Sequence, residues 1–330
     1  MKKFIIKLVF FFIIVVAFWF IISVVSGNGA NSKTFVIVEG QGVNEISNEL
    51  YDANLIKSKF VFETWLWLKK AESKVIAGVY EIPKDISIRH LANLFVIGPG
   101  QSQYAVTLLE GWTRSLMLNT LEEAELDGDR FMSLSSKASD WKKDYDFLAD
   151  APSTASLEGY IFPDTYFVDG STTEEGLIKK TLNNFGKKLN QDIRDEIERQ
   201  GKTIFEVVTL ASIIEREVPD SEDKKMVADI FIKRLDADIG LQSDATVNYV
   251  TGKGLAQPSY ADLEIDSPYN TYKYRGLPPG PISNPGIDSI KAVVYPTPND
   301  YYYFLTTKNG EVIYSKNYEE HLNNKAKYLD

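Results

Sequence analysis

Glu215 is the side chain of this sequence whose type and setting best suit acid–base chemistry. It ends the apolar run LASIIE at residues 210–215. Burial among apolar side chains raises the pKa of a carboxyl group, because desolvation disfavours its charged form. A carboxyl group that holds its proton near neutral pH can act as a general acid. The alternative is structural: Glu215 could form a buried salt bridge with a lysine or an arginine.

One helix is predicted to position Glu215. Thr203 and Glu206 form the T-x-x-E pattern of a capping box that starts the helix, and Pro219 should end it at the preceding residue. At 100° per residue, Glu215 continues an apolar stripe, while Glu206 and Glu217 lie on nearly the opposite face. We therefore expect a largely buried helix in which Glu206 is a cap and Glu217 an exposed acid of the last turn.

Further polar candidates lie in irregular segments. Glu158 stands beside a glycine in residues 149–172, which are rich in breakers and which we interpret as an ordered loop, although an acid beside glycine is also a common turn residue. A second amphipathic helix, at about residues 226–235, precedes Gln242 and Asp244 in a short polar turn.

Residues 266–286, DSPYNTYKYRGLPPGPISNPG, form a stiff, irregular segment because proline and glycine recur along it. It carries Tyr269, Asn270, Thr271 and Tyr272. Rigid loops that display aromatic rings and amides suit sugars, whose apolar faces stack on rings and whose hydroxyl groups take directed hydrogen bonds. A purely structural proline-rich turn is the alternative.

Composition excludes several classes of function. The 330 residues are 44% hydrophobic, enough for one large core or two modest ones, and the net charge of −10 argues against a nucleic-acid partner. The sequence has no cysteine, and its two histidines, His90 and His321, lie far apart, so disulfides, thiolate chemistry and a transition-metal site are not expected. No cofactor is predicted.

The N-terminal residues predict a membrane anchor. Residues 8–25 carry no charge and would extend about 27 Å as a helix, close to the roughly 30 Å hydrocarbon core of a bilayer. A cleaved signal peptide is the alternative, but its apolar region is normally shorter. Lys2, Lys3 and Lys7 precede the span, which predicts a cytoplasmic N-terminus and an extracytoplasmic remainder at the inner (plasma) membrane.

Small strand–helix units dominate the next segment. A strand at 35–38 precedes a helix with Val43, Ile46 and Leu50 on one face, and another strand and amphipathic helix follow within 78–98. Similar units in LysM modules present a shallow groove to a glycan. The alternative is a packing or spacer domain.

Five segments in order resemble the endolytic murein transglycosylase (MltG or YceG-like) family. Along the chain they are SLEGYIFPDTY, LASIIERE, RLDADIGLQSDATVNY, SPYNTYKYRGLPPGPISNPG and YYYFLTTKNGEVIYSKNYEEH. The resemblance implies that Glu215 is the catalytic residue and that the cleft is lined by Glu158, Gln242, Asp244, Tyr269, Asn270, Thr271 and Tyr272. It also implies peptidoglycan glycan strands as substrate and peptidoglycan synthases as candidate partners.

The implied reaction cleaves the MurNAc–GlcNAc bond and leaves a 1,6-anhydroMurNAc end, which limits strand length. It needs one carboxyl group, because the nucleophile is the C6 hydroxyl of the substrate itself. A hydrolase would need a second carboxylate, for which Asp244 and Glu158 are the candidates. A non-catalytic glycan-binding module is the third possibility.

The expected fold class is α+β. Residues 1–26 would form a cytoplasmic tip and transmembrane anchor, 27–34 a tether, 35–100 a LysM-like αβ subdomain and 101–330 a mixed α+β catalytic domain. Near the C-terminus, residues 301–307 and 311–315 should pair as a hairpin across Asn309 and Gly310.

Overall fold

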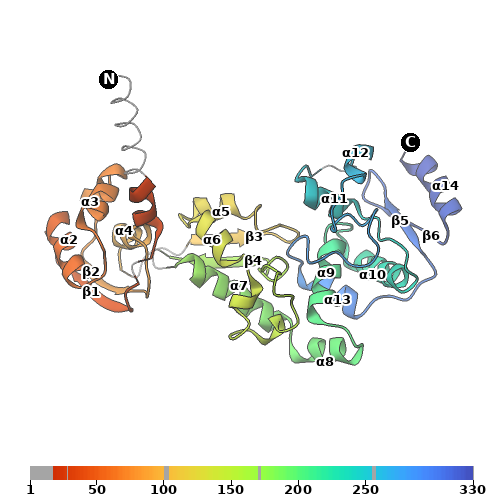
Figure 1. The fold of residues 1–330 in the computed structure, drawn as a ribbon, viewed down its shortest axis with the longest axis horizontal. Coiled ribbons are helices and arrows are strands. Elements are labelled where there is room, and N and C mark those ends of the chain that lie inside the picture. Colours follow the sequence, from red (N-terminus) through yellow and green to blue (C-terminus); the bar gives the residue numbers. More distant parts are fainter. Residues whose placement is uncertain (1–17, 28, 100–103, 170–171, 255–257, 330) are drawn as a thin grey trace, which may run out of the picture. The chain divides into compact units, whose positions relative to one another are not determined.

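A computed structural model describes residues 18–27, 29–99, 104–169, 172–254 and 258–329. These residues have a mixed α+β fold, in which the strands form two-stranded sheets among many helices (Figure 1). They make two compact units. The first comprises the described residues up to Val106 with Thr120–Phe131 and Tyr166–Leu177, and the second comprises Thr107–Asn119, Met132–Thr165 and the residues from Ile178 onward.

The first unit contains the predicted strand–helix pattern. Strand β1 (Lys33–Ile37) pairs antiparallel with β2 (Gly78–Ile82), and α2 (Val43–Asp52) and α3 (Lys59–Leu68) lie between them in the chain. Helix α4 (Ile88–Ile97) follows β2. The expected apolar positions of α2, Ile46 and Leu50, are buried, as the helical spacing predicts.

Five elements contribute residues to both units. They are β3 (Tyr104–Leu108), β4 (Asp164–Val168), α5 (Leu118–Glu123), α6 (Gly128–Leu134) and α7 (Glu174–Lys188). Strands β3 and β4 form a two-stranded sheet. The prediction of a loop through residues 149–172 was therefore wrong over β4, where alternate burial of Tyr166 and Val168 has the period of a strand.

The second unit is mainly helical. Its remaining elements are α8 (Gln191–Arg199), α9 (Ile204–Ile214), α10 (Ser221–Asp236), α11 (Asp244–Thr251), α12 (Tyr260–Leu263), α13 (Ile287–Val294), β5 (Tyr303–Thr306), β6 (Val312–Ser315) and α14 (Tyr318–Tyr328), with short 3₁₀ turns at Ala138–Asp140 and Asp146–Leu148. Helix α9 packs against α10 and α13 and is buried at every residue from Val207 to Ile214. The expected buried helix is confirmed.

The start of α9 follows the prediction, but its end does not. Thr203 is the N-cap and forms the capping box with Glu206. The helix ends at Ile214, not at the residue before Pro219, because the next two backbone N–H groups, of Arg216 and Glu217, bond to carbonyl groups three residues back. This tight turn gives the side chains of Arg216 and Glu217 directions that differ from those of a continued α-helix.

The C-terminal hairpin is confirmed. Strands β5 and β6 pair antiparallel, with Tyr303 opposite Ser315 and Thr306 opposite Val312. The paired strands are shorter than expected, since residues 307–311 form the connection. Gly310 has φ +84° there, a conformation that glycine adopts without steric cost.

The predicted membrane span lies largely outside the described residues, which begin at Phe18. Within the described part of the chain, no helix combines the length and apolar character needed to cross a bilayer.

Candidate functional site

Glu215 occupies the C-cap of α9, and its side chain is 7% exposed. Oε1 accepts a hydrogen bond from Lys224 Nζ at 2.9 Å. Oε2 accepts bonds from the backbone N–H of Gly286 at 2.8 Å and from Ser289 Oγ at 2.7 Å. Three donors, from α10 and from the start of α13, therefore converge on one carboxylate.

These donors favour a negative charge on Glu215. Lys224 is itself buried, and its ammonium group forms a buried ion pair with the carboxylate. A buried pair persists when further hydrogen bonds satisfy the charged atoms, as Gly286 and Ser289 do here. The salt bridge that the sequence left as an alternative is thus present, with Glu215 as its acidic partner.

Ser212 connects helix α9 to the loop that brings Gly286 to Glu215. Its Oγ accepts from the N–H of Ile282, and its carbonyl oxygen accepts from Ser283 Oγ, both at 2.9 Å. Gly286 then becomes the N-cap of α13. The motifs ASIIE and ISNPG, about 70 residues apart, hence form one structure.

Asn284, in the same loop, binds three segments together. Its Oδ1 accepts from the N–H groups of Gly159 at 2.9 Å and Ile161 at 3.0 Å. Its Nδ2 donates to the carbonyl of Trp112 at 2.9 Å and to Glu158 Oε1 at 2.8 Å. All four bonding positions of this buried amide are used.

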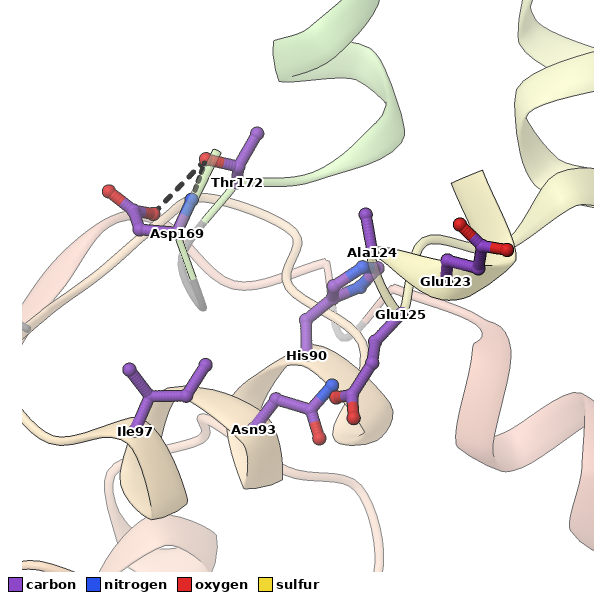
Figure 2. Close-up of a pocket in the computed structure, with 8 residues that line it drawn as sticks. All are labelled: His90, Asn93, Ile97, Glu123, Ala124, Glu125, Asp169 and Thr172. Atoms are coloured by element: carbon purple, nitrogen blue, oxygen red, sulfur yellow. Dashed lines mark hydrogen bonds between the residues drawn. The ribbon is translucent and has the colours of Figure 1, made fainter. Parts of the chain in front are cut away.

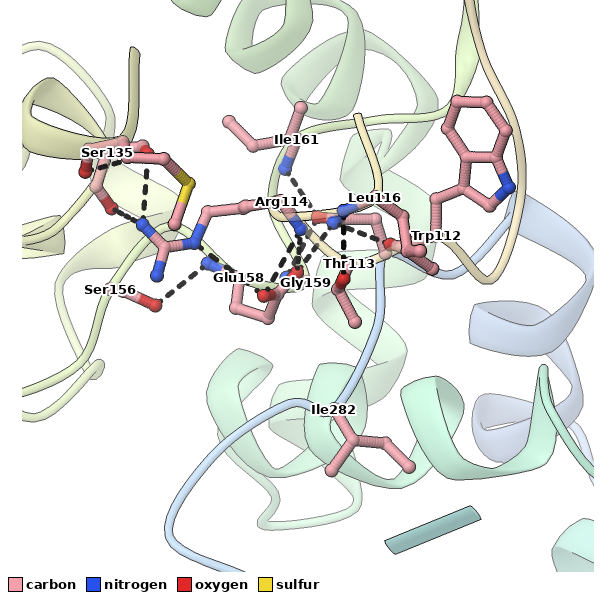
Figure 3. Close-up of polar contacts among 12 residues, drawn as sticks. Trp112, Thr113, Arg114, Leu116, Ser135, Ser156, Glu158, Gly159, Ile161 and Ile282 are labelled. Carbon is pink, nitrogen blue, oxygen red and sulfur yellow. Dashed lines mark hydrogen bonds and ion pairs between the residues drawn. The ribbon is translucent and has the colours of Figure 1, made fainter. Parts of the chain in front are cut away.

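Glu158 is enclosed by protein donors. Its carboxylate accepts from the backbone N–H of Arg114 at 3.0 Å and lies 3.6 Å from Arg114 Nε, and the guanidinium group also binds Ser135 (Figure 3). Burial raises the pKa of Glu158 to about 7, although Arg114 and Asn284 oppose the shift. Glu158 is therefore an internal carboxylate that joins Arg114 to the loop of Asn284.

Glu217 lies among several of the predicted binding residues. Its carboxylate accepts a hydrogen bond from Ser243 Oγ, and burial raises its pKa to about 7. The expectation of an exposed last-turn acid was wrong, because the turn after Ile214 directs this side chain inward. Nearby, Asp244 accepts from the Tyr272 hydroxyl group at 2.6 Å.

The other predicted residues divide into exposed and internal ones. Gln242 is exposed, and its Oε1 accepts from Arg234 at 2.9 Å. Asn270 and Thr271 are 1% exposed. The Asn270 amide donates to the carbonyl groups of Leu263, at the end of α12, and Ile265, and Thr271 Oγ1 accepts from the N–H of Ser243. These two residues shape the loop.

Tyr269 is partly exposed, and its ring lies 5.1 Å from that of Tyr249 on α11. Burial raises the pKa of both phenols, and the negative charge of Glu158 adds to each shift. The rings therefore stand near the Glu158 carboxylate as neutral hydrogen-bonding groups.

Comparison with known proteins now decides the family. Residues 35–327 match the YceG-like family. This chain belongs to the YceG-like family. It is 33% identical over 324 residues to the endolytic murein transglycosylase of Bacillus subtilis (strain 168), which covers 91% of this chain and 86% of that protein.

Two more relatives agree. The endolytic murein transglycosylase of Streptococcus pneumoniae (strain D39) is 34% identical over 91% of this chain, which spans 60% of that longer protein. A crystal structure of a YceG-like protein from Listeria monocytogenes has a TM-score of 0.62 and 31% identity, covering 89% of this chain and 98% of that one.

Several site residues of this YceG-like chain were not predicted. They are Lys224, Ser289, Asn284, Gly286 and Glu110. A weak signal existed for Lys224, since it stands one helical turn before Val227 on the buried face of α10. Asn284 and Gly286 lie within a segment that was singled out, but no local rule identifies their partners.

A small pocket lies in the first unit (Figure 2), whereas Glu215 belongs to the second. The pocket is lined by His90, Asn93, Ile97, Glu123, Ala124, Glu125, Asp169 and Thr172. His90 Nε2 lies 3.1 Å from Glu174 Oε1, and Nδ1 lies 2.9 Å from Ser87 Oγ. Nδ1 thus has a hydrogen-bond partner, whereas buried Nε2 lies within ion-pair distance of Glu174 without forming a hydrogen bond to any described residue.

Proposed function

We propose that this chain is a lytic transglycosylase that cleaves peptidoglycan glycan strands internally. The observation that carries the proposal is the 33% identity to the Bacillus subtilis endolytic murein transglycosylase over 91% of the chain, which includes the Glu215 site. The product is a 1,6-anhydroMurNAc end, and cleavage near the membrane limits the length of nascent strands.

Glu215 is the catalytic carboxylate in this proposal. The reaction needs a proton for the leaving oxygen and an acceptor for the proton of the C6 hydroxyl. Lys224, Gly286 and Ser289 hold Glu215 as an anion, the state that stabilises positive charge on the sugar. Of the predicted binding residues, the exposed Gln242 and the partly exposed Tyr269 and Tyr272 are best placed to contact a glycan.

The hydrolase alternative is weakened by the surroundings of its candidate carboxylates. Glu158 is 4% exposed and bonded to Arg114 and Asn284, so it cannot reach a sugar without losing these bonds. Asp244 is bonded to Tyr272. Of these two candidates only Asp244 is partly exposed, and its bond to Tyr272 competes with a role as nucleophile or as base for water.

Product analysis tests the proposal. We expect the full-length protein to convert purified peptidoglycan into fragments with anhydroMurNAc ends. Each such fragment is lighter than the hydrolysis product by one water molecule, about 18 Da, because the nucleophile is the substrate's own C6 hydroxyl. Mass spectrometry of the digested muropeptides reads this difference directly. Reducing-end sugars would establish the hydrolase, and bound but uncut glycan would establish a binding module.

We propose in addition that the N-terminal apolar residues anchor the chain in the plasma membrane, with the remainder outside. The uncharged residues 8–25 and the preceding Lys2, Lys3 and Lys7 support this topology. Protease added to the outer face of the membrane should digest nearly the whole chain. Protection of the C-terminal unit would show the opposite orientation.

The LysM-like character of the first unit also remains a proposal, supported by its β1–α2–α3–β2 order. If this unit binds glycan, replacing the exposed Trp67 with alanine should reduce the fraction of full-length protein that is pulled down with insoluble peptidoglycan. Unchanged pull-down would favour a spacer.

A further inference from the structure

Glu110 places a second carboxyl group beside Glu215. It follows β3 and is exposed as a residue, but its carboxylate packs on Gly286: a Cβ at position 286 would lie 2.0 Å from Glu110 Oε1 and 2.4 Å from its Cδ. The N–H of the same glycine donates to Glu215 at 2.8 Å. Since a Cβ lies about 2.5 Å from its own nitrogen, the two carboxylates are no more than about 7 Å apart.

The backbone that carries Glu110 is fixed to the site from two sides. The N–H of Gly111 donates to the carbonyl of Asn284 at 2.9 Å. The carbonyl of Gly111 accepts from Arg216 Nη1 at 2.9 Å. Gly111 has φ +74°, and a Cβ there would lie 3.6 Å from Glu215 Cγ. Glu110 is thus positioned by Arg216, the neighbour of Glu215, and by Asn284, two residues before Gly286.

The two acids have opposite surroundings. Glu215 has three donors, including the Lys224 ammonium group, whereas among the described residues no hydrogen bond reaches the Glu110 carboxylate. Partial burial of that carboxylate raises the pKa of Glu110, and the negative charges of Glu215 and Asp288 raise it further while Lys224 lowers it. The Arg216 guanidinium group donates its hydrogen bond to the Gly111 carbonyl oxygen.

We propose that Glu110 is a second catalytic residue, the proton donor to the glycosidic oxygen, and that Glu215 is the fixed anion beside it. The inference rests on the proposed transglycosylase function. Two neighbouring carboxyl groups with different surroundings commonly divide the acid and anion roles in glycan cleavage. Glu110 is the donor in this proposal, because it is exposed to the substrate and is not paired with a buried ammonium group as Glu215 is.

The step balances without water or a cofactor. Glu110 gives its proton to O4 of the leaving sugar as the C1–O4 bond breaks, and Glu215 stabilises the positive charge that develops at C1. The C6 hydroxyl of the same MurNAc residue attacks C1, forming the C1–O6 bond. Its proton passes to the Glu110 carboxylate, so the acid is restored within the turnover.

The test compares two leaving groups in the full-length protein. Glu110→Gln should reduce cleavage of glycan strands at least about 100-fold, since an amide cannot donate the proton, with a melting temperature close to that of the wild type. The same variant should lose much less of its rate on a MurNAc glycoside with a p-nitrophenyl leaving group, because phenolate leaves without protonation and only the acceptance of the C6 hydroxyl proton is still missing. Its residual activity on strands should also lack the wild-type decline at alkaline pH.

Gly286→Ala is the second variant. Gly286 has φ −71°, which alanine adopts without strain, but the new Cβ must displace the flexible end of Glu110. We expect a loss of at least about tenfold in turnover with stability preserved. Glu222→Gln, an exposed acid on α10, is the matched control and should leave turnover within a few-fold.

The outcomes separate this inference from the proposed function. If the wild type forms no anhydro ends, the proposed function fails. If it forms them and Glu110→Gln retains near-normal cleavage, only the role of Glu110 is overturned. A loss in Glu110→Gln that the p-nitrophenyl substrate does not restore would likewise overturn it, because it would indicate a structural defect.

Discussion

Glu215→Gln is expected to reduce glycan-strand cleavage at least about 100-fold and to lower the melting temperature as well. The first effect follows from the proposed role of Glu215 as the anion that stabilises positive charge on the sugar. The second follows from Lys224, whose buried ammonium group would lose its charged partner at 2.9 Å. Breaking a buried ion pair on one side costs about 3–5 kcal/mol. Turnover and thermal unfolding of the same preparation measure both effects.

A double variant separates catalysis from structure. In Glu215→Gln with Lys224→Met, no buried charge remains unpaired, so the melting temperature should recover most of its loss. Cleavage should stay as low as in the single variant. Recovery of cleavage together with stability would mean that the pair serves only the fold, and Glu215 would then not be the catalytic carboxylate.

Asn284→Ala is expected to destabilise the second unit by at least about 3 kcal/mol and to abolish cleavage. The substitution leaves two backbone N–H groups, of Gly159 and Ile161, and the Trp112 carbonyl without this partner, and removes a donor from Glu158. Each unsatisfied buried group costs about 1–3 kcal/mol. Urea unfolding followed by tyrosine and tryptophan fluorescence measures the loss.

Two comparisons sharpen this result. Asn323→Ala changes an exposed asparagine of α14 and should alter stability by less than about 0.5 kcal/mol. Asn284→Asp keeps the shape of the side chain but replaces Nδ2 with an oxygen that faces Glu158, so it should destabilise almost as much as alanine. A tolerated aspartate would show that the amide donor does not matter.

What the sequence could predict here was local. The capping box of Thr203 and Glu206 and the buried stripe of α9 depend on residues within a few positions, and both are confirmed. The turn after Ile214 was missed because no glycine or proline between Ile214 and Pro219 marks it, and with it the inward direction of Glu217 was missed.

The partners of Glu215 could not be predicted by local rules. Gly286 and Ser289 lie more than 70 residues along the chain, and they reach Glu215 only because Ser212 binds the preceding loop. Glu110, by contrast, lies more than 100 residues before Glu215 in the chain, just after strand β3 of the β3–β4 sheet. Candidate acids can be found from their types, whereas their charge states depend on such distant donors.

Pro285 protects the side-chain amide of Asn284 against deamidation. Asparagine deamidates when the backbone nitrogen of the next residue attacks the side-chain carbonyl, and Pro285 has no N–H with which to do so. Asn309 precedes Gly310 in the exposed hairpin turn and has no such protection. As a protein population ages, this spontaneous damage should therefore accumulate at the surface turn, while the amide that joins the loops around the site persists.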